Sequence, residues 1–176
     1  MVQQLLVDYA NEVFDVSFPR WDDLPKFDLH MDQVLELLNE YLAVLKLTND
    51  PLVTKSMIHN YLKLELIPKP QKKRYNRKHL AYLIAIIMLK NIITIPEIKT
   101  GVMHQSKVSG LKGAYELLIT VQENAFKHAA SLYLDQNFER GEVHPEDRFS
   151  LVRQVTDNLA SQTFVKLFLE NTESKA

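Results

Sequence analysis

Apolar residues recur at three- and four-residue spacing along most of the chain, which is the pattern of helices with one buried side. Met31, Val34, Leu38 and Leu42, for example, would share one side of a helix that begins near Asp28. The same spacing predicts helices over residues 3–14, 28–46, 54–64, 76–91 and 94–100, and longer ones over 111–132 and from about 145 to 170. We therefore predict an all-α fold.

Glycine, proline and capping residues support these boundaries. Residues 1–100 contain no glycine, and the seven prolines fall between the periodic segments or in the first turn of one. Thr54 and Asn76 are suited to the N-cap positions of two helices, and Thr94 with Glu97 has the spacing of a capping box. Residues 101–110, which contain two glycines, are predicted to be a linker.

Positive charge is concentrated in one part of the chain. Between Thr54 and His79 there are 8 of the 21 lysines and arginines and a single acid, Glu65, so this segment carries +7. Residues 1–53 carry -7 and residues 80–176 carry -1, which brings the whole chain to -1. The near-neutral total hides a cationic segment that a polyanion would meet as a local positive field.

The helix predicted over 54–64 has two chemically different sides. Ile58, Tyr61 and Leu62 would point toward the core. The opposite side carries short polar and cationic groups that can hydrogen-bond base edges in the major groove of DNA. These base-reading candidates are Lys55, Ser56, His59, Asn60 and Lys63.

The segment 68–75 is predicted to leave this helix as a projecting basic loop. Pro68 and Pro70 keep it extended, and Tyr75 would return the chain to the core. Its cations, with two more at the start of the next helix, are suited to the sugar–phosphate backbone, where they would add affinity and salt dependence without sequence preference. The phosphate candidates are Lys69, Lys72, Lys73, Arg74, Arg77 and Lys78.

Residues from about 50 to 102 resemble the DNA-binding domain of MerR-type transcriptional regulators. The resemblance is carried by Ile58-His59-Asn60-Tyr61, Leu66-Ile67-Pro68, Lys72-Lys73-Arg74-Tyr75-Asn76, the apolar helix that follows His79-Leu80, and Pro96-Glu97-Ile98. It implies a winged helix-turn-helix, with 54–64 as the recognition helix and 68–75 as a short basic wing. The family usually has glycine where Glu65 stands, and a longer wing.

More of the chain, starting from Trp21-Asp22-Asp23-Leu24-Pro25, is similar to an uncharacterised domain-of-unknown-function family of Gram-positive bacteria, itself MerR-like. We expect three parts: a helix and loop over 1–27 that pack on the core, a winged helix-turn-helix over 28–102, and a helical dimerisation or effector region over 103–176. MerR-type proteins dimerise through C-terminal helices, so the resemblance implies a homodimer. An intramolecular helical bundle is the alternative.

Other kinds of chemistry have little support in the residues. The chain has no cysteine, which excludes disulfides and thiolate metal sites. Asp28, His30 and Asp32 resemble a metal cluster, but positions two apart on a helix face different ways, so helix capping explains them better. No motif arranges a nucleophile or a phosphate loop, and we expect no catalytic activity, no metal and no cofactor.

The predicted function is that of a cytoplasmic transcriptional regulator that binds double-stranded DNA. The most apolar run, Leu80 to Leu89, is too short to span a bilayer, and the N-terminus lacks the features of an export signal. The alternative is a winged-helix interaction module whose basic loop docks an acidic protein partner without binding DNA. A small-molecule effector, which the sequence does not specify, would need a pocket among the C-terminal aromatic residues.

Overall fold

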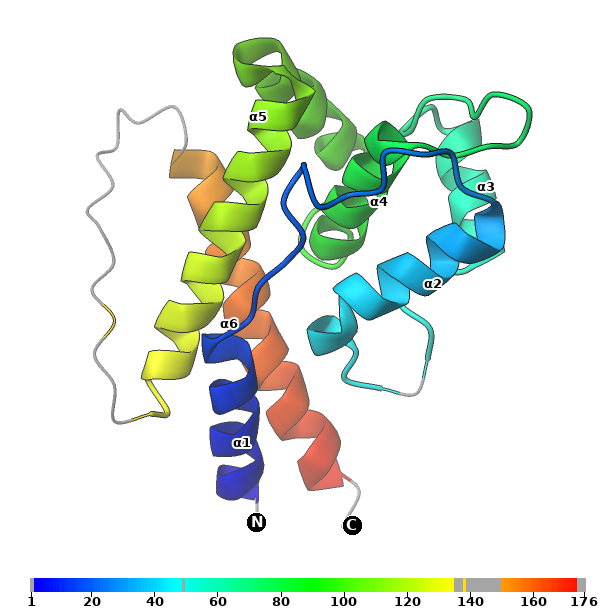
Figure 1. Cartoon of the computed structure of the whole chain (residues 1–176). Helices are drawn as coiled ribbons and strands as arrows, with labels where there is room; N and C mark the ends of the chain where they lie inside the picture. Colours follow the sequence, from blue (N-terminus) through cyan, green and yellow to red (C-terminus); the bar gives the residue numbers. More distant parts are fainter. Residues whose placement is uncertain (1, 49, 135–137, 139–149, 174–176) are drawn as a thin grey trace. The chain divides into compact units, whose positions relative to one another are not determined.

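The computed structural model describes residues 2–48, 50–134, 138 and 150–173. Within these ranges the regular secondary structure is helical (Figure 1): α1 (Val2–Phe14), α2 (Met31–Tyr41), the 3-10 helix η1 (Ala43–Leu45), α3 (Lys55–Lys63), α4 (Arg77–Leu89), α5 (Ile95–Ser131) and α6 (Ser150–Glu173). The extended pairings among these residues are two isolated bridges, Leu29 with Tyr75 and Gln71 with Arg74. The prediction of an all-α fold is confirmed.

The predicted capping residues begin three of the helices. The Thr54 hydroxyl accepts the backbone N–H of the third residue after it (3.2 Å), which fixes the start of α3. The Asn76 side chain accepts the N–H of the second residue after it (3.1 Å) at the start of α4. The Thr94 N–H donates to the Glu97 carboxylate (2.7 Å) before α5. These starts were predictable because each cap bonds within three residues of its own position.

Two of the predicted segments, the second helix and the linker before residue 111, have wrong boundaries. The second helix begins at Met31, because His30 is its N-cap and donates its backbone N–H to the Gln33 side chain (2.9 Å); the helix ends at Tyr41, and η1 follows. Residues 101–109 of the predicted linker are helical and belong to α5, since a glycine costs a helix only about 1 kcal/mol and no proline interrupts this stretch. The helical geometry is broken only at Gly110, where φ is 72°. The predicted start of the last helix, near 145, lies outside the described residues.

The chain forms two compact units, which we call the central unit (residues 18–119) and the terminal unit (residues 1–17 and 120–176). This division differs from the expected boundaries after residues 27 and 102. The loop 18–27 and the first part of α5 belong with the helices between them rather than with the chain ends.

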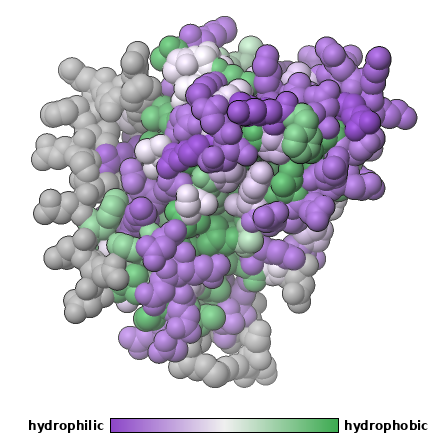
Figure 2. Space-filling model, viewed as in Figure 1, coloured by the Kyte–Doolittle hydropathy of each residue, from purple (hydrophilic) through white to green (hydrophobic). Residues whose placement is uncertain are grey.

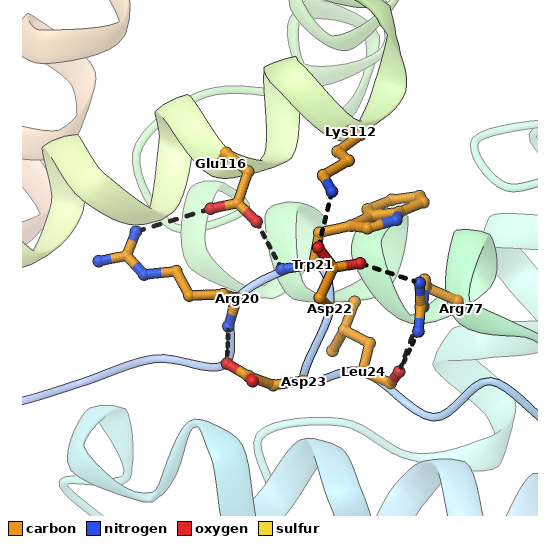
Figure 3. A network of polar contacts seen from close by, with 8 residues as sticks. All are labelled: Arg20, Trp21, Asp22, Asp23, Leu24, Arg77, Lys112 and Glu116. Atoms are coloured by element: carbon orange, nitrogen blue, oxygen red, sulfur yellow. Dashed lines mark hydrogen bonds and ion pairs between the residues drawn. The ribbon is translucent and has the colours of Figure 1, made fainter.

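Polar contacts explain why the loop 18–27 belongs to the central unit (Figure 3). The backbone N–H of Trp21 donates to the Glu116 carboxylate (2.6 Å), and the Lys112 ammonium donates to Asp22 (2.7 Å). The hydrogen bond from Lys112 is the main cause of a lowered pKa at Asp22. The Trp21 ring also packs edge-on against Tyr115, with 6.1 Å between the centroids. The loop is thus attached to α5 by residues about 90 positions later in the chain.

Helix α4 forms the middle of the central unit. Every residue of its apolar run from Leu80 to Leu89 is buried except Tyr82, and α2 packs against it. Burial of nearly the whole circumference explains why this run shows no polar side. In the described part of the chain, no helix combines the length and apolar character needed to cross a membrane.

The terminal unit is built from α1, the end of α5 and α6. Helix α1 packs on α6, where Tyr9 meets Phe164 edge-on at 5.2 Å between ring centroids. Phe164 also stacks on Tyr133 at 4.8 Å. Gln122 of α5 is fully buried and donates to the backbone carbonyl of Thr156 in α6 (3.3 Å). Aromatic contacts and one buried amide therefore hold these helices together.

Candidate nucleic-acid interface

Helix α3 has the two sides that its sequence predicts. Ile58 and Tyr61 are 0% and 4% exposed, and both belong to the core of the central unit. The five base-reading candidates, Lys55, Ser56, His59, Asn60 and Lys63, are all exposed. The exposed side therefore offers hydroxyl, imidazole, amide and ammonium groups along a helix of nine residues.

One of these candidates has a partner inside the protein. The Lys55 ammonium lies 2.5 Å from a carboxylate oxygen of Asp32, in the first turn of α2. Both side chains are more than half exposed, and an exposed pair of this kind contributes only about 0–1 kcal/mol. Lys55 can therefore exchange this partner for another anion at small cost.

Helix α3 ends in a backbone conformation that glycine adopts most easily. The N–H of Leu66 donates to the carbonyl of Tyr61 (2.9 Å), and the N–H of Glu65 donates to that of Leu62 (3.2 Å). This pair of bonds defines a Schellman motif and requires a left-handed residue after the C-cap. Glu65 supplies it with φ of 54°, at the position where the MerR-type resemblance has glycine.

The segment 68–75, which we call the basic turn, reverses direction at two lysines. The N–H of Arg74 donates to the carbonyl of Gln71 (2.8 Å) across Lys72 and Lys73, whose φ values are 47° and 59°. Positive φ at both central residues is the signature of a two-residue type I′ turn, which normally selects asparagine and glycine. Lysine at both positions is therefore unfavourable for the backbone. Both lysine side chains are exposed at the tip of the turn.

The end of the basic turn is anchored in the core. Tyr75 exchanges two backbone hydrogen bonds with Leu29 (2.7 and 2.9 Å) and is 3% exposed. Its ring contacts the imidazole of His79 edge-on, with 5.4 Å between centroids. This pairing fixes where the turn leaves the domain. The sequence does not predict this pairing, because Leu29 lies 46 positions before Tyr75 and no local pattern marks a single pair of extended residues.

His79 joins the basic turn to the start of α4. Its Nδ1 accepts the backbone N–H of Asn76 (3.0 Å), so His79 completes the capping of α4. Burial lowers the pKa of His79, because the charged imidazolium would lose its hydration; nearby backbone carbonyls, that of Pro68 foremost, oppose this shift in part. The neutral ring is the form that fits this site.

Arg77 is removed from the phosphate candidates, because its guanidinium is used inside the central unit (Figure 3). Its Nε and Nη2 donate to the carbonyl of Leu24 (3.2 and 2.8 Å), and Nη1 lies 3.5 Å from Asp22. The guanidinium carbon also lies over the Trp21 ring, 5.7 Å from the ring centroid, and the Arg77 side chain is 18% exposed. Arg77 thus holds the loop 18–27 against α4.

The other phosphate candidates are exposed, and several of them surround the tip of the basic turn. Lys69, Lys72, Lys73, Arg74 and Lys78 form no ion pair with any residue that the structure describes. Figure 1 shows the connection between α3 and α4 as an extended loop, and Figure 2 shows hydrophilic residues gathered over it. Their charges are therefore available to an external polyanion.

Comparison with protein families gives one match that fits these boundaries. The model of DUF1836, described as a domain of unknown function, matches residues 19–118, which is more than half of the chain. The chain belongs to the DUF1836 family. The resemblance to a family of unknown function is thereby confirmed, while the resemblance to MerR-type regulators stays a prediction. Neither the curated proteins nor the solved structures include a match.

The extent of the DUF1836 domain agrees with the central unit, residues 18–119. The domain therefore includes the loop held by Arg77 and the part of α5 that carries Lys112 and Glu116. Within the described residues of the chain, no three histidine, aspartate or glutamate side chains come together in a way that would hold a metal ion. The DUF1836 domain contains the polar side of α3 and the basic turn, both of which are exposed.

Proposed function

We propose that this DUF1836 protein is a transcriptional regulator that binds double-stranded DNA through a winged helix-turn-helix. Helices α2 and α3 form the helix-turn-helix, α3 enters the major groove, and the basic turn is the wing. One observation carries the proposal: a helix with an exposed polar side is followed by an anchored turn that holds two lysines at positive φ. A strained backbone that displays charge is more often kept for binding than for stability.

Helix α3 and the basic turn would have different roles in binding. The exposed side of α3 carries Ser56, His59 and Asn60, whose short side chains can read base edges, and Lys63 beside them. The cations of the basic turn would contact phosphates and position α3 without selecting a sequence. The base-reading set would therefore determine sequence preference, and the turn would determine the strength of binding and its dependence on salt.

The terminal unit supports a homodimer as the binding form. Among its described residues, the exposed large apolar side chains are Leu132, Tyr133, Leu151, Val165, Phe168 and Leu169. Leu151, Val165 and Phe168 lie along one side of α6, with spacings of 14 and 3 residues that suit the seam of a helix pair. Two copies would present two α3 helices to two half-sites.

Dimerisation is tested by sedimentation equilibrium of the full chain. We expect a mass of twice 20.4 kDa at micromolar concentration, and a shift toward 20.4 kDa for Phe168→Glu. A mass of 20.4 kDa at every concentration would remove the homodimer from the proposal.

DNA binding is tested by fluorescence anisotropy of a labelled mixed-sequence duplex at several salt concentrations. The test variant replaces Lys72, Lys73 and Arg74 with glutamine. The matched control replaces Lys26, Lys46 and Lys107, which are exposed elsewhere, so that both variants lose three positive charges. We expect the slope of log affinity against log salt to fall by about 3 in the test variant and to change little in the control.

Two other outcomes would count against this proposal. Equal losses in the two variants would mean that net charge, and not the basic turn, governs binding. No binding by folded protein at low salt would refute the proposal and leave the alternative, a module that docks an acidic protein partner. His59→Ala and Asn60→Ala address base reading, since they should change the preference among duplexes and leave the salt slope unchanged.

A further inference from the structure

The central unit contains a hollow that shares only Pro68 and Lys69 of the basic turn with the proposed DNA contact. It has a volume of about 330 Å³ and lies between the end of α3, the segment 65–69, α4 and the start of α5. Its walls are mostly apolar and include Leu62, Ile67, Tyr82, Ile86, Ile98 and Val102. The volume is at the lower end of the range for small-molecule sites in proteins. An apolar body of modest size would replace water there favourably.

Three charged side chains also line this hollow: Lys69, Lys99 and Glu65. The Lys99 ammonium donates to the carbonyl of Leu64 at the end of α3 (3.2 Å), which holds it in place. An ammonium group has three N–H donors, so two of them remain for another acceptor. Neither lysine forms an ion pair within the described part of the chain. The charges add to +1, which favours an anion over a cation.

We propose that this hollow binds a small amphipathic organic acid. The apolar body would lie among the side chains of α4 and α5, and the carboxylate would accept hydrogen bonds from Lys99, with Lys69 adding attraction at the rim. An alcohol of the same length would bury the same apolar surface but would leave the two ammonium groups without an anion. Glu65 opposes the carboxylate, so its charge should weaken binding.

Methyl NMR of the full chain with ¹³C-methyl methionine tests the proposal, with octanoate as the ligand and octan-1-ol as its uncharged counterpart. Met103 lines the hollow and is 52% exposed, whereas Met57 lies in α3 and outside the hollow. We expect octanoate to shift the Met103 signal in a saturable way and the Met57 signal much less. Octan-1-ol should bind at least about 5-fold more weakly, as expected when roughly one ion pair is lost.

Charge variants identify the groups that hold the carboxylate. Lys69→Gln and Lys99→Gln should each weaken octanoate binding about 3- to 5-fold, and Glu65→Gln should strengthen it by a similar factor. None of the three should change the affinity for octan-1-ol. Lys78→Gln is the matched control, since Lys78 is an exposed lysine outside the hollow, and it should leave octanoate binding unchanged.

Three results would overturn the inference. The first is an unshifted Met103 signal in folded protein at millimolar octanoate. The second is equal affinity for the acid and the alcohol. The third is the same loss in Lys78→Gln as in Lys69→Gln, which would show non-specific attraction. The inference does not rest on DNA binding, because no nucleic acid enters the experiment.

Discussion

Replacing Glu65 with glycine should stabilise the central unit. Glu65 occupies the left-handed position of the Schellman motif, with φ of 54°. A residue with a Cβ atom pays about 1–2 kcal/mol in this conformation, whereas glycine does not. About 0.4–1 kcal/mol of this advantage is lost, because a glycine at this position makes the unfolded protein more flexible. A net gain of about 0.5–1 kcal/mol remains.

Alanine at the same position is the control that isolates the backbone. Both Glu65→Gly and Glu65→Ala remove the carboxylate, which lies at the negative end of the α3 dipole and is itself unfavourable there. Only Glu65→Gly removes the steric cost of the Cβ atom as well. The difference between the two variants, and not the gain over the parent protein, therefore measures the cost of the left-handed conformation minus the flexibility that glycine adds to the unfolded chain.

Urea unfolding followed by tryptophan fluorescence is the appropriate assay. Trp21 is the single tryptophan of the chain and lies in the central unit, so its signal reports that unit. With a slope of about 1–3 kcal/mol per molar urea, the midpoint of Glu65→Gly should exceed that of Glu65→Ala by about 0.2–1 M. Equal midpoints, or a lower one for glycine, would refute the assignment of backbone strain to Glu65.

Substitutions at the basic turn, at His79 and at Arg77 test three other contacts of the central unit. Lys72→Asn combined with Lys73→Gly should stabilise the basic turn, raising the urea midpoint while lowering the salt slope of DNA binding by about 2. The folded-state pKa of His79 lies below its ordinary value of 6.5, so the free energy of unfolding should be highest above about pH 6.5 and should fall as the pH is lowered. His79→Gln keeps a capping acceptor but does not titrate, so it should flatten the dependence of the urea midpoint on pH. Arg77→Gln should cost about 1–3 kcal/mol in urea unfolding, because the Leu24 carbonyl loses its charged donor. A urea midpoint of the parent protein that does not change with pH would contradict the prediction for His79. An Arg77→Gln midpoint equal to that of Lys78→Gln would contradict the prediction for Arg77.

Features that depend on neighbouring residues were predictable from the sequence. The caps at Thr54 and Asn76 bond within three positions, and the two sides of α3 follow from helical periodicity alone. The burial of α4 follows from an apolar run that no polar side interrupts. In each case the physical cause acts within one element, so a single sequence contains it.

Features that depend on distant residues were not predictable. Arg77 belongs to the basic segment by position, but its partner, the Leu24 carbonyl, lies 53 residues earlier in the chain. The tight reversal at Lys72 and Lys73 contradicts the residue preference of its own turn type, so local statistics point away from it. Residues 101–109 of α5 are an error of the opposite kind, because their glycine content predicts a linker and the chain forms a helix there instead.

These long-range contacts change the charge that DNA would meet. Of the eight basic residues between 54 and 79, Lys55 is paired with Asp32 and Arg77 is used within the central unit. Six remain without an ion pair to any described residue: Lys63, Lys69, Lys72, Lys73, Arg74 and Lys78. Since each phosphate contact contributes about 0.9 to the salt slope, one DUF1836 domain can produce a slope no steeper than about -6 with these six groups and Lys55, which can exchange Asp32 for a phosphate at small cost. A measured slope near -10 would require both copies of a dimer on one duplex, and a slope between these values would indicate cations outside this segment.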